Sequence, residues 1–298
     1  TSGVNGTVNT LALNGDQLIF GGSFTRLAVD NSDANSVAAF NISAETWDTL
    51  GAEGNGGTVS SPVRGNGVSN LGVTALLAHN GGVYLGGTEG PFRAYNSQTS
   101  AVGIDAIAHW DGAAWHALTN AHTQGANSRG VHSTIRGIHA LALDSQGHLY
   151  VGGSFAAIGN VSANSIARWD GSAWHSLGGD SGDKGNGVDG VVYALALDSN
   201  DHLYVGGDFT RAFGDSADGL GLSANRIAKW DGAAWTPLGA GMGTIGNGVN
   251  AAVWALAVDN NDNLAVGGQF GTAYNTSGDS ISANFVALWN GTGWAALG

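Results

Sequence analysis

The sequence predicts an all-β fold, and three observations support this prediction. Glycine contributes 51 of the 298 residues but proline only 3, a composition that weakens helices without indicating collagen or a Pro-rich linker. No stretch shows the 3.6-residue apolar period of an amphipathic helix. A unit of about 60 residues, made of short apolar runs and turn signals, occurs five times and fills the chain.

Each unit is marked by a Gly-Gly doublet after a short apolar run, followed by a pair of aromatic residues. The doublets are Gly21-Gly22, Gly86-Gly87, Gly152-Gly153, Gly206-Gly207 and Gly267-Gly268. The aromatic pairs are Phe40/Trp47, Trp110/Trp115, Trp169/Trp174, Trp230/Trp235 and Trp289/Trp294. Cuts after each Leu-Gly or its equivalent give five repeats, called the first to the fifth below, over 1–50, 51–118, 119–178, 179–239 and 240–298.

Each repeat is predicted to form four short strands, and the fourth repeat shows them in order. "ALALDSNDHLYV" is two apolar runs around an Asp-rich tight turn, which predicts the first two strands. Leu203, Tyr204 and Val205 are apolar at successive positions, as expected of a strand covered on both faces. "IAKW" is the third strand, and the Asp-Gly of "WDGAAW" is a hairpin turn into the fourth. Four antiparallel strands repeated radially make one five-bladed β-propeller domain over 1–298.

The Gly doublets and the tryptophans have a physical role in this prediction. Glycine permits close approach of neighbouring backbones, or a positive φ, where a side chain would clash. The tryptophans are expected to fill the wedge between neighbouring blades, each contributing a few kcal/mol by burial.

The repeat resembles the kelch motif, in which a Gly doublet ends the second strand and two spaced aromatic residues mark the third and fourth. The first repeat is most similar, because "FNISAETW" keeps the kelch spacing, whereas the other four shorten it and place Trp where kelch has Tyr. The resemblance covers all five repeats and is shared with propellers of cell-surface and secreted proteins. It implies fold rather than activity, because kelch-type propellers serve as scaffolds, ligand binders and oxidases. The copper chemistry of the galactose-oxidase branch needs a Tyr–Cys cross-link, and this chain has no cysteine.

Composition excludes several classes of function. A formal net charge of −13 disfavours nucleic acid or anionic membrane as partners. The absence of cysteine excludes disulfides, thiolate metal sites and cysteine nucleophiles. No apolar run approaches the roughly 20 residues of a membrane helix. The chain begins at Thr1 without a signal peptide, so we expect a mature or excised segment.

A four-strand meander places the first and third turns of each repeat on one face, the tight-turn face, and the second connection on the other, the loop face. The tight-turn face is strongly acidic. Asp at hairpin turns is usually local chemistry, because its carboxylate accepts backbone N–H bonds. The alternative is a weak calcium site, since "DSND" and "DNNDN" cluster oxygen ligands. No cofactor is therefore expected, with calcium as the alternative and Asp198, Asp201, Asp259 and Asp262 as its candidate ligands.

The loop face carries the long, irregular segments in which binding sites usually lie. Its cationic and polar side chains suit an anionic or polyhydroxylated ligand. An alternative interpretation is that these polar residues are only solvated. The candidate ligand-binding residues are Arg64, Arg93, Tyr95, Arg129, His132, Arg136, Asp208 and Asp215.

No catalytic residue is predicted. A glycoside hydrolase needs paired carboxylates, and only three glutamates exist, Glu45, Glu53 and Glu89. Asp208 and Asp215 lie in one loop, but nothing in their spacing requires catalysis. His122, His132 and His139 lack the tight spacing of metal motifs.

We therefore expect a non-catalytic extracellular module that binds a protein or glycan at the cell surface, or assembles with copies of itself. The alternative is a propeller that binds or cleaves carbohydrate through the loop face. Low lysine content and the absence of cysteine favour the extracellular setting. Five sequons fit a secreted glycoprotein without proving one, at Asn5, Asn41, Asn160, Asn275 and Asn290.

Overall fold

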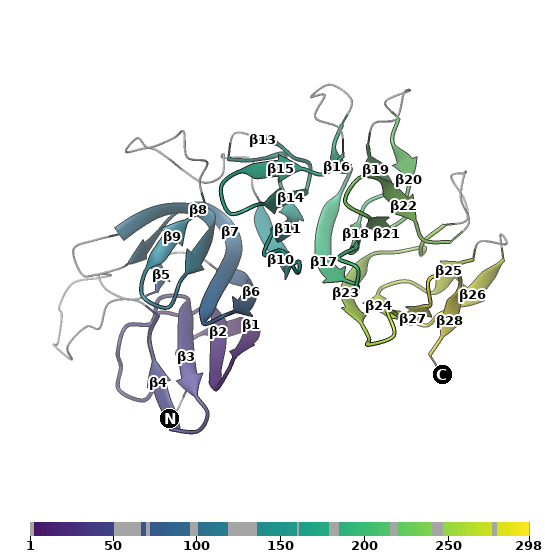
Figure 1. Ribbon diagram of the computed structural model, residues 1–298. Coiled ribbons are helices and arrows are strands. Elements are labelled where there is room, and N and C mark those ends of the chain that lie inside the picture. The colour runs from purple at the N-terminus through teal and green to yellow at the C-terminus, as the bar shows by residue number, and fades with distance from the viewer. Residues whose placement is uncertain are drawn as a thin grey trace. The chain divides into compact units, whose positions relative to one another are not determined.

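The computed structural model describes residues 3–50, 67–69, 72–95, 101–118, 136–159, 161–178, 185–214, 220–239, 247–275 and 279–297. Within these ranges every regular element is a β-strand (Figure 1). The chain forms two compact units, Thr1–Leu141 and Ala142–Gly298, each of which is described by itself. The boundary between them falls within β10 of the third repeat.

The first repeat is a four-stranded antiparallel meander of order β1-β2-β3-β4. Its first two strands are joined by a two-residue turn, in which Gly15 takes a φ of 61° that favours glycine. The strands are β1 (Thr7–Asn14), β2 (Gln17–Ser23), β3 (Val37–Asn41) and β4 (Thr46–Asp48).

The second repeat departs from this pattern at its loop end. Its second and third strands continue as one long hairpin, whose pairing runs from Val83 opposite Trp110 to Tyr95 opposite Ala101. The segment "TEGPFRAYNSQTSAVG", expected to be a loop, is therefore largely strand. The strands are β5 (Val68–Ser69), β6 (Val73–His79), β7 (Gly82–Tyr95), β8 (Ala101–Trp110) and β9 (Trp115–Ala117).

The third, fourth and fifth repeats share one plan, with a main four-stranded sheet and a small sheet at the loop end. The main sheets have the orders β10-β11-β14-β15, β17-β18-β21-β22 and β23-β24-β27-β28. The small sheets have the orders β12-β13, β16-β19-β20 and β25-β26.

The bounds of these strands follow the chain. Those of the third repeat are β10 (Gly137–Leu143), β11 (Leu149–Ser154), β12 (Ala157–Ile158), β13 (Val161–Ser162), β14 (Ile166–Trp169) and β15 (Trp174–Ser176). Those of the fourth are β16 (Gly187–Val188), β17 (Val191–Leu197), β18 (Leu203–Asp208), β19 (Arg211–Phe213), β20 (Leu222–Ser223), β21 (Ile227–Trp230) and β22 (Trp235–Pro237). Those of the fifth are β23 (Val253–Val258), β24 (Leu264–Gly268), β25 (Thr272–Tyr274), β26 (Ser280–Ser282), β27 (Val286–Trp289) and β28 (Trp294–Ala296).

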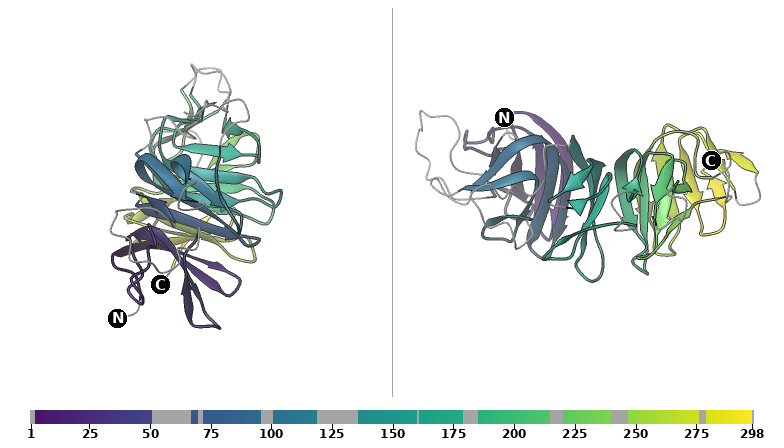
Figure 2. Two further views of the ribbon diagram at one scale, coloured as in Figure 1. Left: turned by 90° about the vertical axis from the view of Figure 1, so that its left-hand side faces the viewer. Right: turned by 90° about the horizontal axis from the view of Figure 1, so that it is seen from above.

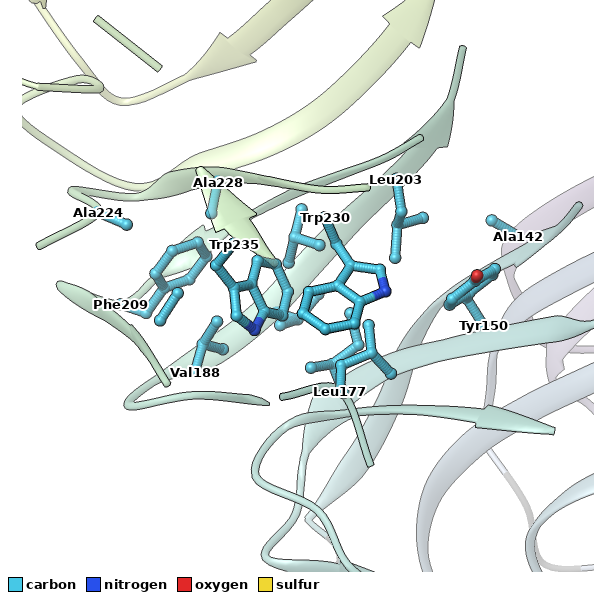
Figure 3. Close-up of a cluster of buried hydrophobic side chains, with 14 residues drawn as sticks. Ala142, Tyr150, Leu177, Val188, Leu203, Phe209, Ala224, Ala228, Trp230 and Trp235 are labelled. Atoms are coloured by element: carbon cyan, nitrogen blue, oxygen red, sulfur yellow. The ribbon is translucent and has the colours of Figure 1, made fainter. Parts of the chain in front are cut away.

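The core of each unit lies between neighbouring sheets. Within unit 2 the first strands β17 and β23 are in contact, and the sheets of the fourth and fifth repeats lie side by side (Figure 2). Trp230 and Trp235 of the fourth repeat pack in one cluster with Leu177, which ends the third repeat, and with Val188 of the link (Figure 3). The predicted role of the tryptophans as a wedge between repeats is confirmed at this position.

The structure confirms the all-β class and the four-stranded antiparallel blade of a β-propeller. Leu203, Tyr204 and Val205 are all buried, as their continuous apolar run predicted. The ring of five blades, its boundaries as one domain and the kelch-like assignment stay predictions.

Candidate functional site

At the tight-turn end, each aspartate closes its own turn. In the fourth repeat one oxygen of Asp198 accepts the backbone N–H groups of Asn200 and His202, both at 3.0 Å. Its other oxygen lies 2.9 Å from Nδ1 of His202 and 3.2 Å from Nζ of Lys229. Burial raises the pKa of Asp198, but these hydrogen bonds outweigh that effect, so its pKa lies below the usual value.

The same turns are joined from one repeat to the next within unit 2. Asp201 accepts from both the backbone N–H and the hydroxyl of Ser145, at 2.9 and 2.5 Å. One repeat further on, Asp262 accepts the same pair of bonds from Ser199, at 2.9 and 2.6 Å. These carboxylates hold successive repeats in register.

The Asp-Gly hairpins use their aspartates in a similar way. Asp111 accepts the backbone N–H groups of Ala113 and Ala114 at 2.8 and 2.7 Å, and lies 2.7 Å from Nε2 of His116. These bonds, with those from Ala114 and Ala113 strongest, lower the pKa of Asp111 to about 2. Asp170 has the equivalent bonds, including one of 2.6 Å to His175, and its pKa is also lowered.

The four calcium candidates therefore already have hydrogen-bonding partners. Asp198, Asp201 and Asp262 accept the bonds described above, and Asp259 accepts from Asn261 and Asn263. In the part of the chain that the structure describes, no group of three or more His, Asp or Glu side chains could hold a metal ion. Local turn chemistry accounts for these carboxylates, and calcium stays an untested prediction.

At the loop end, the residue two places after the link glycine fastens the following loop. Asn5 accepts the N–H groups of Thr25 and Arg26 at 2.8 and 2.9 Å, and Asp189 does the same for Thr210 and Arg211 at 2.7 and 2.8 Å. Several arginines here also have internal partners. Arg26 pairs with Asp33 at 3.7 Å, Arg211 donates to the Leu220 carbonyl, and Arg226 lies 3.3 Å from Asp208.

The predicted ligand-binding residues fall in three groups. Arg93 on β7 and Arg136 before β10 lie in unit 1 and are exposed, and no described residue forms a hydrogen bond or ion pair with either guanidinium. Asp208 ends β18 in unit 2 and is paired with Arg226. Tyr95 ends β7. Arg64, Arg129, His132 and Asp215 lie outside the described residues, so the predicted site stays a prediction.

The described sequon asparagines take part in local structure. Asn5 donates from Nδ2 to the Thr25 hydroxyl at 3.0 Å, in addition to its two accepted bonds. Asn41, Asn275 and Asn290 each accept a backbone N–H, from Ala44, Trp294 and Thr292 respectively. Asn160 lies outside the described residues. Glycosylation stays untested at all five.

The structure reveals two apolar surfaces that the sequence analysis missed. Val8 and Leu11 of β1 are 38% and 54% exposed, whereas their counterparts Val73, Val192 and Val253 in later repeats are fully buried. We call Val8, Leu11 and Leu13 the first-repeat face.

The second apolar surface lies on the fifth repeat. Trp254 and Phe285 are 52% and 61% exposed, and Val286 is exposed where Ile166 and Ile227 are fully buried. We call Trp254, Gly267, Phe285 and Val286 the fifth-repeat face. Comparison of burial at equivalent positions identifies both faces, and the sequence pattern alone does not, because these residues follow the repeat.

Comparisons with known proteins do not show a family. No family model matches the chain, and no curated protein does. Among solved structures, it is similar to a PL25 ulvan lyase (13% identity, 99% of this chain and 72% of that one, TM-score 0.48). It is also similar to a GH74 xyloglucanase from Xanthomonas campestris (16% identity, 97% and 38%, TM-score 0.45).

A third similar structure is the extracellular domain of a proposed one-component system from B. thetaiotaomicron, at 13% identity and a TM-score of 0.47. The chain covers 93% of itself in that comparison but spans only 27% of the length of that protein. With TM-scores below 0.5, these similarities carry no argument about function.

Proposed function

We propose that this protein is a non-catalytic extracellular module that binds a partner or builds a surface assembly. One observation carries the proposal. Two groups of large apolar side chains are exposed at the first and fifth repeats, at positions that the repeats between them bury.

The exposure is more than the scatter of single apolar residues on any protein surface. Scattered exposed leucines and valines need no explanation, but grouped ones indicate an interaction site. Val8 and Leu11 lie on one strand, and Phe285 is followed directly by Val286. Their repeat equivalents form interfaces between sheets, so these side chains have the chemistry of an interface.

The extracellular setting is part of the proposal and rests on composition, namely the lack of cysteine, the low lysine content and the sequons. In the residues that the structure describes, no helix is long and apolar enough to cross a membrane. We propose a protein or glycan at a cell surface as the partner.

The accessibility of the two faces in solution tests the proposal. Wild-type protein, dilute enough to be monomeric, is expected to enhance the fluorescence of the apolar dye ANS. The double variant Leu11→Asp/Trp254→Asp is expected to lose most of that signal. Ile42→Asp is the matched control, because Ile42 is also exposed but lies outside both faces. Equal dye binding by wild type and the double variant would overturn the proposal.

A second candidate function is binding or cleavage of carbohydrate through the loop end. It is favoured by Arg93 and Arg136, whose exposed guanidinium groups no described residue engages and which suit an anionic sugar. The test is a screen of anionic polysaccharides with wild type, Arg93→Ala and Arg136→Ala. Binding that survives both substitutions would contradict this candidate. Hydrolysis that survives both but is lost in Asp208→Ala would indicate a cleaving enzyme instead.

A further inference from the structure

The repeats within each unit contact one another through one recurring arrangement. The residue opposite the second glycine of its own doublet, such as Val73 opposite Gly87, packs over the first glycine of the preceding repeat. A Cβ on Gly21, Gly152 or Gly206 would lie 2.5 Å from a methyl of Val73, Val192 or Val253 respectively. A leucine three residues further on, at Leu76, Leu195 or Leu256, completes the contact at 3.0 to 3.4 Å.

From this arrangement we propose that the fifth-repeat face binds the first-repeat face of a second copy of this chain, head to tail. The inference rests on the proposed assembly function and names its partner. Three features of the internal contacts, each with one half on either face, support it.

The first feature is the glycine contact. At Gly267, the first glycine of the fifth doublet, a Cβ would meet only Ala255, at 3.8 Å. The residues equivalent to Val253 and Leu256 are Val8 and Leu11, by their pairing with Gly22 and Phe20. Both are exposed. The fifth repeat thus has the receiving glycine without its valine and leucine, and the first repeat has the valine and leucine without their glycine.

The second feature is the contact between the third strand and the link. Ile166 and Ile227 are covered by the link glycines, and a Cβ on Gly187 or Gly248 would lie 3.2 Å from their methyl groups. Val286 is the equivalent residue and is exposed. Gly3, the equivalent link glycine, has no atom within 4 Å of its own Cβ position.

The third feature is a hydrogen bond from the bulged residue of the first strand. In unit 1, Asn9 donates to the Val73 carbonyl at 3.0 Å and Thr74 donates to the Ile138 carbonyl at 2.5 Å. Trp254 holds this position in the fifth repeat, and its indole is half exposed. Its N–H is suited to donate to the Val8 carbonyl of a second copy.

Phe285 adds backbone strain to the same face. The residue before the third strand takes a positive φ in every repeat, and small residues hold this position at Ser36, Ala106 and Ser165. The fifth repeat places a phenylalanine there at φ 75° and exposes it. A bulky residue in the left-handed region is unfavourable, and such strain gathers at functional positions.

A second copy fits these observations because the two halves are different and complementary. Such a contact is heterologous, so it propagates from copy to copy into a ring or a filament. Closure within one chain, the five-bladed ring predicted from the sequence, is the competing occupant. Both halves are exposed in the structure, which favours the second copy.

Disulfide formation between single-cysteine variants separates these occupants, because the chain has no cysteine of its own. Val8→Cys and Gly267→Cys are purified separately, mixed and oxidised. A disulfide-linked heterodimer is expected. Val8→Cys mixed with Ala233→Cys, an exposed position on a hairpin of the fourth repeat, is the control and is expected to give none. A double variant Val8→Cys/Gly267→Cys that forms its disulfide within one chain, while the mixture forms no heterodimer, would overturn the proposal.

A complementation experiment tests the direction of the contact without a cross-link. Wild type is expected to self-associate in sedimentation velocity, with Leu11→Asp and Trp254→Asp each at least about tenfold weaker, as at an interface hot spot. A mixture of the two variants is expected to form 1:1 dimers and nothing larger, because each variant keeps one intact face. Ile42→Asp is expected to behave as wild type, and circular dichroism checks that all variants are folded.

The outcomes of this experiment are distinct. Self-association that survives Leu11→Asp, or wild type that stays monomeric at every concentration, contradicts the second-copy proposal. In the latter case ANS binding to the same faces would leave the proposed binding function standing. If the dye signal is also insensitive to the double variant, both proposals fail.

Discussion

A single methyl group separates a buried glycine that must be glycine from one that need not be. Gly206 receives Val253 of the next repeat so closely that a Cβ would lie 2.5 Å from its methyl group. Gly267 stands at the equivalent place, and its Cβ would meet only Ala255, at ordinary contact distance. The doublet motif is identical in sequence at both positions, but the packing requirement differs.

We therefore expect Gly206→Ala to lower the free energy of unfolding by about 1–3 kcal/mol, the range for overpacking a close contact. Gly267→Ala should be neutral or slightly stabilising, because alanine reduces the freedom of the unfolded chain. Denaturant unfolding of both variants at a concentration that keeps the protein monomeric measures the difference. Equal destabilisation would mean that the Gly267 contact is already occupied within one chain.

The aspartate of the second repeat's hairpin gives a prediction about pH. Asp111 has its pKa lowered from 3.8 to about 2, first by the N–H groups of Ala114 and Ala113 and then by His116. A carboxyl with a lowered folded pKa stabilises the fold above its unfolded pKa, and this contribution is lost as pH falls from 3.8 through about 2.

His116→Ala is expected to raise the pKa of Asp111 while leaving it below 3.8, because both backbone bonds remain. The carboxyl carbon shift of Asp111, followed by NMR between pH 5 and 1.5, measures it. Asp111→Asn is the control, since Asn290 forms the same turn in the fifth repeat without a charge. A pKa of Asp111 at 3.8 in wild type would contradict the hydrogen-bonded geometry.

At the scale of elements, a buried pair of amides joins each loop to the next link. Asn247 is fully buried. It accepts from the Asn225 backbone N–H at 2.9 Å and donates to the Ser223 carbonyl at 2.7 Å. Asn186 makes the same two bonds to Asn164 and Ser162. These bonds hold the loop end of one sheet to the start of the next.

Asn247→Ala leaves two buried backbone groups without their partner, so we expect it to lower the free energy of unfolding by about 2–4 kcal/mol. Asn247→Asp should be intermediate, because a carboxylate can accept from Asn225 but cannot donate to Ser223. Asn250→Ala, which removes an exposed cap on Gly271 and Thr272, should cost about 1 kcal/mol or less. Chemical denaturation compares the three. A loss for Asn250→Ala as large as that for Asn247→Ala would contradict this ranking.

These elements show what sequence reasoning reached. Short-range chemistry was readable, so the hairpins at Asp111 and Asp198 and the four strands of each repeat were predicted in the right order. The amide pair was present in the strings "SAN" and "GNGV", but its meaning depends on contact between segments 22 residues apart. The long hairpin of β7 and β8 was misjudged because its polar, glycine-containing sequence resembles a loop.

The turn aspartates also predict the response to calcium. Asp198, Asp201, Asp259 and Asp262 already accept between two and four hydrogen bonds or ion pairs each, and calcium would have to replace these partners. We expect neither millimolar calcium nor EDTA to change the melting temperature. A rise with calcium that is lost in Asp262→Asn would show that the calcium alternative is correct.

At the scale of the whole molecule, the number of blades and the partner of the outer faces were beyond the sequence. A repeat pattern specifies how one sheet packs on the next, and the same residues serve whether that next sheet belongs to the same chain or to another. Val8 and Val253 occupy the same place in the pattern, and only their exposure distinguishes them. The candidate ligand site fared similarly, because the position of loop residues such as Arg93 depends on irregular segments rather than on the repeat.

The net charge of the molecule makes the assembly proposal sensitive to salt. Each copy carries a formal charge of −13, so two copies repel one another at low ionic strength. The contact itself is apolar and has no ion pair to lose. Raising the salt concentration from about 10 mM to about 0.15 M shortens the screening length from roughly 30 to 8 Å.

Self-association of wild type should therefore strengthen over this range, with the dissociation constant measured by sedimentation falling as salt rises. Leu11→Asp should remain monomeric at every salt concentration, because screening restores no apolar contact. Ile42→Asp, with the same change in net charge, should follow wild type. Association that weakens with salt would mean that ion pairs rather than Val8, Leu11 and Trp254 hold the copies together, and the head-to-tail contact would be wrong.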